Sequence, residues 1–386
     1  MESSFLAHDH HECRDGRVRE IIVEFFTYRN PCRCMEQQRR RFLDELLTTA
    51  TPSGFETPGQ RRWVEYVEEF ADEVRTDSYG NAVAVLEGNE TSIALTGHSD
   101  EIGFMVRDIE ESGILRMTPV GGSDRTVSKG QHVRIHTDAG PVPGVIGQTA
   151  IHLRDHEDES LTDIDEQYID IGADDAAEAE ELVERGDPVT FDQTISELEN
   201  GRIAARGLDN RIGIWAAAEA LRRAAERDHE ATIYAVSTVQ EEVGLQGAKM
   251  VGFDLAPDAV VAIDVTHATD TPDITSAQKT GVELGDGPVV VRGSANHPRL
   301  VDAVRRTAAA ADIDIQLQAS GTNTGTDADA FYTSRGGIPS VNVGVPNRYM
   351  HTPVEVVDLA DLETVAELLS AVPATVADRD LSTSIE

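Results

Sequence analysis

The sequence predicts an α/β protein, in which a mixed, mostly parallel sheet is covered by helices on both faces and carries a small inserted β domain. Short, almost wholly apolar segments alternate along the chain with amphipathic helical patterns, as in sheets that are buried on both sides. Between residues 106 and 197 this alternation stops, and glycine-rich β-like pieces precede a strongly acidic stretch. We therefore expect a main α/β domain over 35–105 and 198–386 and an inserted β domain over 106–197.

The individual elements follow from hydrophobic periodicity. Met35 opens an amphipathic helix with the sequence MEQQRRRFLDELLTTA, and a second helix over 210–227 places Ile212, Trp215, Ala216 and Ala220 near one face. Two further helices are expected over 298–311 and about 358–376. The expected strands of the main domain cover 82–86, 93–96, 231–239, 259–263, 313–318 and 339–345.

The composition is strongly acidic. Among 386 residues, 40% are hydrophobic, which is enough for a large core, while 70 acidic residues face 33 basic ones and give a net charge of −37. The acids are spread between well-patterned apolar segments, so they indicate a charged surface instead of a disordered tail. Such a surface repels nucleic acid and anionic membranes, and counterions would relieve its self-repulsion. We interpret the chain as a cytoplasmic protein from a high-salt organism.

The first 34 residues differ from the rest of the chain. All three cysteines, Cys13, Cys32 and Cys34, lie there, so the body of the chain has no disulfide framework. The histidines around His10 could join these cysteines in a zinc cluster, but the spacing matches no common structural zinc pattern. We expect residues 1–34 to be an extension outside the fold. No signal-peptide layout and no membrane-spanning apolar run is present in the sequence.

Histidines and carboxylates follow several of the predicted strands. In open α/β sheets the binding site lies beyond the carboxyl ends of the strands, so these positions converge on one edge. The first strands lead to His98 and Asp100 and to the pair Glu241–Glu242. Three more candidates are Asp264 after the next strand, His351 after the last one, and Asp209 just before the helix over 210–227.

Each of these residues alone has an ordinary explanation. Asp209 before a helix would serve as an N-cap, and the two glutamates would be solvated surface in so acidic a chain. A shared metal site explains all of the positions together. Two divalent ions need a bridging carboxylate and terminal histidine and carboxylate ligands, and this mixed set suits zinc, or cobalt and manganese.

The predicted chemistry is hydrolysis by a hydroxide held between the two ions, with a free carboxylate that moves the proton. Adjacent glutamates can divide the tasks, one binding metal while the other faces the water. Asp100, two residues after His98, is placed to hydrogen-bond that imidazole and fix its tautomer.

The sequence around these positions resembles one family, the dinuclear metalloaminopeptidases of the TET and glutamyl-aminopeptidase type, metallopeptidase family 42. The resemblance runs in order from about residue 35 to the C-terminus. Residues 1–34 have no counterpart in the family pattern, and the acidic stretch over 155–166 departs from it. The matching strings are GHSDEIGF at 97–104, GLDNRIG at 207–213, VQEEVGLQGA at 239–248, DVT at 264–266, DTP at 270–272, GDGP at 285–288, GTDADAF at 325–331 and RYMHTPVE at 348–355.

The resemblance implies a zinc-exopeptidase type of fold and a role for each candidate. His98 and Asp264 would hold one ion, Glu242 and His351 the other, and Asp209 would bridge them. Glu241 would be the general acid/base, and Asp100 would orient His98. The family also implies peptide substrates, cleavage of the first peptide bond, and an inserted β domain used for contacts within a dimer-based homo-oligomer that can reach a dodecamer.

Two other functions remain open at this point. A related dinuclear deacylase acting on N-acyl amino acids or other small amides would share the metals and the base. A catalytically silent, metal-stabilised scaffold is the alternative outside the enzymes, and the intact Glu241 with a complete ligand set argues against it. The sequence does not reveal the preferred N-terminal residue, although the 320–332 region is expected to contribute to its pocket.

Overall fold

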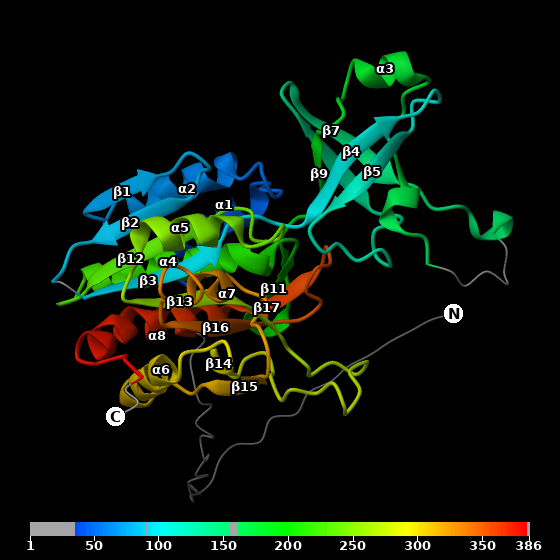
Figure 1. The fold of residues 1–386 in the computed structure, drawn as a ribbon. Coiled ribbons are helices and arrows are strands. Elements are labelled where there is room, and N and C mark those ends of the chain that lie inside the picture. Colours follow the sequence, from blue (N-terminus) through cyan, green and yellow to red (C-terminus); the bar gives the residue numbers. More distant parts are fainter. Residues whose placement is uncertain (1–34, 90, 155–160, 228, 384–386) are drawn as a thin grey trace, which may run out of the picture. The chain divides into compact units, whose positions relative to one another are not determined.

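The main domain is built on one large mixed sheet (Figure 1). The computed structural model describes residues 35–89, 91–154, 161–227 and 229–383. The sheet has eight strands, which in spatial order are β1 (Glu73–Thr76), β2 (Ala82–Leu86), β12 (Thr232–Thr238), β3 (Ser92–His98), β13 (Ala259–His267), β16 (Ser340–Asn347), β14 (Val289–Gly293) and β15 (Gln316–Ser320).

The centre of this sheet is parallel and its flanks are mixed. Strands β12, β3, β13 and β16 run parallel to one another, and so do β14 and β15. The β1–β2, β2–β12 and β14–β16 pairings are antiparallel. The predicted fold class, a mixed sheet with helices and a small β domain, is confirmed.

Side chains alternate between the two faces of the sheet, and both faces are buried, which explains why successive residues of these strands are apolar. In β2, Ala82, Ala84 and Leu86 pack into one core, while Val83 and Val85 pack into the core on the other side. Five helices cover the first face: α1 (Gln37–Thr48), α2 (Thr57–Val67), α4 (Leu208–Ala225), α6 (Pro298–Ala310) and α8 (Leu359–Ala377). The second face carries α5 (Gln246–Leu255) and α7 (Ala328–Phe331) over the β2, β3, β12 and β13 side of the sheet.

Helix α4 is the central helix of the fold. It was expected to be amphipathic, but it is buried over almost its whole surface, because α1, α2 and α8 cover the side that faces away from the sheet. Its run of alanines presents small side chains, which allows neighbouring elements to approach closely on several sides.

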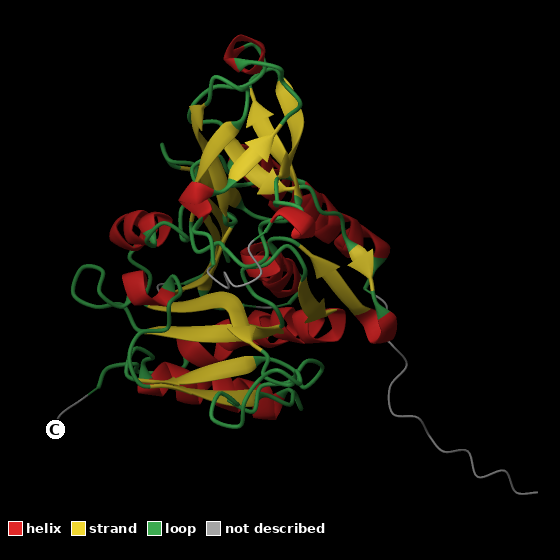
Figure 2. Cartoon of the chain, turned by 90° about the vertical axis from the view of Figure 1, so that its right-hand side faces the viewer, coloured by secondary structure: helices red, strands yellow, loops and turns green. Residues whose placement is uncertain are grey.

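The small β domain is a closed six-stranded barrel, whose strands are yellow in Figure 2. Its own apolar core includes Phe104, Met117, Ile135 and Ile169. The barrel strands in spatial order are β4 (Gly103–Ile109), β5 (Leu115–Val120), β8 (Tyr168–Asp170), β7 (Gly140–Ile146), β6 (His132–Thr137) and β9 (Pro188–Phe191). The helix α3 (Ala176–Glu180) and the short 3-10 turns Ile151–Leu153 and Ile164–Glu166 lie between barrel strands.

Several elements differ from the periodicity-based expectations. Strand β13 was expected to end before Asp264, but its pairing with β16 continues to His267. Helices α2 and α5 and strands β1 and β14 were not expected. A three-stranded sheet of β10 (Ser196–Glu197), β11 (Arg202–Ala205) and β17 (Glu355–Asp358) was also missed, with a 3-10 turn at Glu199–Gly201. These strands are too short for a periodic signal.

Two sequence-based predictions concern the ends of the chain and its relation to membranes. The predicted extension over residues 1–34, with its cysteines and histidines, lies outside the described residues. Within the described ranges, no helix is both long and apolar enough to cross a bilayer.

Candidate metal centre

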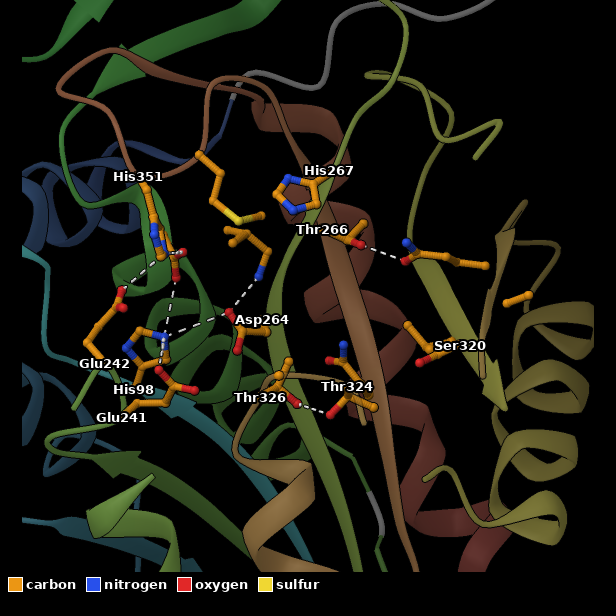
Figure 3. Close-up of a pocket in the computed structure, with 18 residues that line it drawn as sticks. His98, Glu241, Glu242, Asp264, Thr266, His267, Ser320, Thr324, Thr326 and His351 are labelled. Carbon is orange, nitrogen blue, oxygen red and sulfur yellow. Dashed lines mark hydrogen bonds and ion pairs between the residues drawn. The ribbon is translucent and has the colours of Figure 1, made fainter. Parts of the chain in front are cut away.

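The seven predicted site residues come together at the carboxyl edge of the parallel strands (Figure 3), where Asp100 lies next to His98. His98 ends β3, and Glu241 and Glu242 lie in the loop after β12, whose Thr238 pairs with His98. Asp264 lies inside β13, and His351 lies in the loop between β16 and β17. These loops and strand ends are far apart in sequence, and the parallel pairing brings them to one edge.

Asp209 lies at the centre of the cluster. Its Oδ1 is 3.3 Å from His98 Nε2, and its Oδ2 is 3.3 Å from His351 Nε2. The Asp209 carboxylate faces the two imidazoles instead of capping the following helix, whose N-cap is Gly207. One carboxylate therefore faces two histidines from different parts of the chain.

The remaining carboxylates lie around these histidines. Asp264 Oδ1 is 3.8 Å from His98 Nε2, and Glu242 Oε1 is 3.6 Å from His351 Nε2. Glu241 Oε2 also lies 3.8 Å from His98 Nε2. Three groups of side chains are close enough to hold an ion: His98 with Asp209 and Asp264, Asp209 with Glu242 and His351, and His98 with Glu241 and Glu242. The first two groups share Asp209.

Asp100 supports three members of the cluster from behind. His98 Nδ1 lies 3.3 Å from Asp100 Oδ1 and 3.2 Å from the Asp100 carbonyl oxygen, so the other ring nitrogen faces the cluster. The Asp100 carboxylate also accepts hydrogen bonds from the backbone N–H groups of Glu241 and Glu242 and from the Ser53 hydroxyl. The expected contact of Asp100 with His98 is present. The hydrogen bonds from the backbones of the two glutamates to Asp100 were not predicted from the sequence.

The approach of β3 to α4 fixes the distance between His98 and Asp209. A Cβ on Gly97 would lie 2.7 Å from the carbonyl carbon of Gly213, which is closer than real Cβ contacts allow. Glycine at position 97 therefore lets strand β3 pack directly against the helix backbone. The first turn of α4, with Asp209, is thereby brought next to the end of the strand.

Glu355 is a supporting residue for which sequence reasoning assigned no role. Its Oε2 accepts a hydrogen bond from the backbone N–H of Asp209, and its Oε1 accepts one from the N–H of His351, both at 2.9 Å. Burial raises the pKa of Glu355 to about 8, and the nearby Asp209 carboxylate contributes to the increase. Glu355 thus ties together the backbones of two residues that both face the centre of the cluster.

Replacing Glu355 with glutamine should weaken metal binding without unfolding the protein. The amide NH2 group would face one of the two backbone N–H groups, so one hydrogen bond would be lost and a donor left unpaired. We expect metal affinity to fall by roughly 10–100-fold, as for other residues that orient ligands. Competition with a chromogenic chelator would measure it. Glu87→Gln, the same substitution at an exposed position, is the control, and equal affinities in both variants would contradict this role.

The electrostatics of the cluster fit divalent cations. Burial raises the pKa of Glu241 to about 10 and that of Glu242 to about 8, and neighbouring carboxylates add to both shifts. Burial likewise raises the pKa of Asp264 well above its usual value. Burial alone would also raise the pKa of Asp209, but hydrogen bonds from His351 and His98 hold it below its ordinary value.

One buried carboxylate oxygen also indicates a cation site. Glu242 Oε1 is buried and has no hydrogen-bond partner among the described residues. So many buried carboxyls in one place are costly unless cations neutralise them, and histidine nitrogens with carboxylate oxygens are suitable ligands. The residues present therefore fit a site for divalent metal ions.

The cluster lines one end of a cavity of about 350 Å³. The rest of the cavity extends over the second face of the sheet, beside β13, β16, β14 and β15. The 320–332 region expected at the substrate pocket contributes only its first part, through Ser320, Thr324, Gly325 and Thr326. Ala328, Ala330 and Phe331 are buried instead, because α7 packs against the sheet.

A mixed α/β sheet with this cluster at its carboxyl edge defines a protein of the metallohydrolase class. The M42 glutamyl aminopeptidase family matches residues 80–368, and the chain belongs to that family. The protein is accordingly an enzyme, a hydrolase of the aminopeptidase type.

Individual relatives agree with this family. The lysyl aminopeptidase of Pyrococcus furiosus is 35% identical over 333 residues, which cover 85% of this chain and 95% of the relative. The solved TET aminopeptidase of the marine sediment archaeon Thaumarchaeota archaeon SCGC AB-539-E09 has a TM-score of 0.83 and 33% identity, covering 87% of this chain and 96% of that one. The Pyrococcus horikoshii TET1 peptidase, which can assemble into a tetrahedron or a large octahedral shell, has a TM-score of 0.78 and 33% identity and covers 87% of this chain and 99% of that one.

Proposed function

We propose that the protein is a metal-dependent aminopeptidase that hydrolyses the first peptide bond of peptides at the cluster around Asp209. The observation that carries this proposal is the pair of three-residue groups that share Asp209 at the end of the cavity. Membership of an aminopeptidase family supports it.

His98 and Asp264 would hold one ion, Glu242 and His351 a second, and Asp209 would lie between them. When bound, the ions would polarise the substrate carbonyl and lower the pKa of the attacking water. Zinc is the proposed metal, with cobalt and manganese as alternatives of similar ligand preference.

Glu241 is the proposed general acid/base. Its side chain lines the cavity, and its backbone N–H is fixed by the Asp100 carboxylate, so the carboxyl group is held at the cavity wall. Burial among carboxylates raises its pKa, and cations bound beside it would lower that pKa again, so that it could take a proton from the attacking water and return it to the amine of the leaving peptide. Asp100 would orient His98, and Glu355 would hold the backbones of Asp209 and His351 in place.

Other features of the proposal concern the surroundings of the enzyme. The inserted β domain, which the sequence predicts over residues 106–197, would provide contacts within a homo-oligomer that is dimer-based and can extend to a dodecamer. The TET1 peptidase of Pyrococcus horikoshii assembles into shells, which supports this part of the proposal. A cytoplasmic location and a need for high salt stay predictions from the composition.

An assay on aminoacyl chromogenic substrates in high salt would test the proposed function. We expect turnover that disappears on treatment with a chelator and returns when zinc, cobalt or manganese is added back. A peptide with a blocked N-terminus should resist cleavage, because an aminopeptidase acts beside a free α-amine. Cleavage of N-acyl amino acids but of no aminoacyl substrate would contradict the proposal and favour the deacylase. Turnover that persists after complete metal removal would also contradict it.

A further inference from the structure

Beyond the cluster around Asp209, the cavity continues over the sheet, and side chains of the strands form its floor. Because side chains alternate along a strand, Asp264 and Thr266 of β13 face the same side as Asn342 of β16. Val291 of β14 and Gln318 of β15 complete this floor. The same face is covered by α5 and α7 only on the β2–β12–β3–β13 side of the sheet.

A missing side chain shapes the floor. A Cβ on Gly344 would lie 2.9 Å from the Cβ of Thr266, so only glycine lets Thr266 lie over β16 at this point. The Thr266 hydroxyl then donates a hydrogen bond of 2.6 Å to Gln318 Oε1 on the edge strand (Figure 3). This bond joins residues 52 positions apart and crosses the floor of the cavity.

The loop after β15 forms the wall next to this floor. The hydroxyls of Thr324 and Thr326 lie 2.9 Å apart (Figure 3). The Ser320 hydroxyl donates a hydrogen bond to the Asn323 carbonyl oxygen. Asp329 does not line the cavity, and its carboxylate accepts hydrogen bonds from the N–H groups of Thr324 and Gly325 and from the Thr324 hydroxyl. The wall is therefore made of hydroxyl groups and backbone.

The two ends of the cavity differ in charge. All of the described carboxylates that line it belong to the cluster around Asp209, and none of the described lysines and arginines lines it. Beyond the cluster, His267 is the one titratable side chain among the described residues that line the cavity, and burial lowers its pKa, which disfavours the charged form. The remaining lining side chains carry amides, hydroxyls, a thioether or hydrocarbon.

We propose that this neutral part of the cavity receives the side chain of the substrate's first residue, and that the enzyme selects uncharged first residues. The inference rests on the proposed aminopeptidase function. A charged side chain here would lose water and gain no opposite charge, which is costly in a buried site. An uncharged side chain pays no such penalty, and the amide and hydroxyl groups can bond to a polar one. Gln318 is the specificity-determining residue, since it reaches across the floor.

This preference differs from what the names of the relatives describe. The Pyrococcus furiosus relative is a lysyl aminopeptidase, and the family is described as glutamyl aminopeptidase. A lysyl side chain would be favoured by a carboxylate in the pocket and a glutamyl side chain by a lysine or arginine. Beyond the Asp209 cluster, the lining residues of this cavity offer neither.

A substrate panel with one leaving group and varied first residues tests the preference. We expect kcat/KM for leucyl, methionyl and glutaminyl substrates to exceed that for lysyl and glutamyl substrates by at least about tenfold. A charged substrate that is cleaved best would overturn the inference and leave the aminopeptidase assignment intact. Absence of turnover with every substrate in the panel would instead refute the proposed function.

Charge substitutions at Gln318 provide the sharper test. Gln318→Lys should raise the relative kcat/KM for glutamyl substrates, and Gln318→Glu should do so for lysyl substrates, each by about tenfold or more and mainly through KM. Leu317→Lys is the matched control, because Leu317 precedes Gln318 on the same strand, faces away from it and is 48% exposed. Its selectivity should equal that of the wild type.

A second pair of variants and a binding measurement guard against loss of folding. Ser320→Lys and Ser320→Glu place the same charges on the same face of β15, and they should shift selectivity in the same directions. Calorimetry on the metal-loaded Glu241→Gln variant, with and without Gln318→Lys, would give Kd values for dipeptides. Those Kd values should rank the first residues in the same order as kcat/KM does. The assignment of this subsite is wrong if folded Gln318 variants change the preference for the second residue of the peptide. It is also wrong if they leave every preference unchanged.

Discussion

Glu241→Gln should bind its metal ions normally and lose most of its turnover. Glutamine has the size of glutamate but cannot take up and release a proton, and general acid–base catalysis typically contributes about 10²–10⁴-fold. We expect kcat to fall within that range while metal content, measured by elemental analysis of the purified protein, stays at the wild-type value. The Asp100 hydrogen bond to the backbone of residue 241 does not depend on its side chain, so the loop should keep its place.

The adjacent variant Glu242→Gln is the matched comparison. It makes the same chemical change one residue further on, where the carboxylate faces His351 at 3.6 Å. We expect Glu242→Gln to lose metal as well as turnover. The structure also contains a group of His98, Glu241 and Glu242 that could hold an ion. If Glu241→Gln loses as much metal as Glu242→Gln, then Glu241 is a ligand and the proposed base must be another residue.

Asp209→Asn should have the largest effect on metal binding. Its two carboxylate oxygens face His98 and His351 at 3.3 Å each, so the substitution disturbs both proposed ion positions at once. The asparagine side chain is neutral and presents one oxygen where the carboxylate presents two. We expect the affinity for both ions to fall by more than the roughly 10–100-fold seen for residues that only orient ligands. Activity should disappear at ordinary metal concentrations.

His351→Ala separates the two ion positions and serves as the comparison for Asp209→Asn. It removes a nitrogen that lies near Asp209 and Glu242, while His98 and Asp264 are untouched. Metal content should fall by about one ion per chain in His351→Ala and further in Asp209→Asn. Full two-ion stoichiometry in His351→Ala would refute its assignment as a ligand. Equal and partial loss in the two variants would refute Asp209 as the shared residue.

The residues of the cluster could be found from the sequence because each lies next to a recognisable element. The apolar runs before His98, Glu241 and Asp264 are long enough to predict strands, and residues that follow parallel strands meet at one edge. The supporting residues could not be found in this way. Glu355 acts through hydrogen bonds to backbone groups 146 and 4 positions away, and no local pattern encodes those partners.

The sequence by itself determined the fold class, the identity of the cluster residues and, through its resemblance to one family, the proposed roles of Asp209 and Glu241. These follow from local periodicity, from residue types that bind metal, and from strings that occur in order along the chain. Only the tertiary structure decided that Asp209 faces both histidines, that Glu355 holds two backbones, and that the substrate end of the cavity is neutral. Those properties depend on which segments pair across the sheet. The contact of Thr266 with Gln318 over Gly344 exists only when β13, β16, β14 and β15 lie in that order.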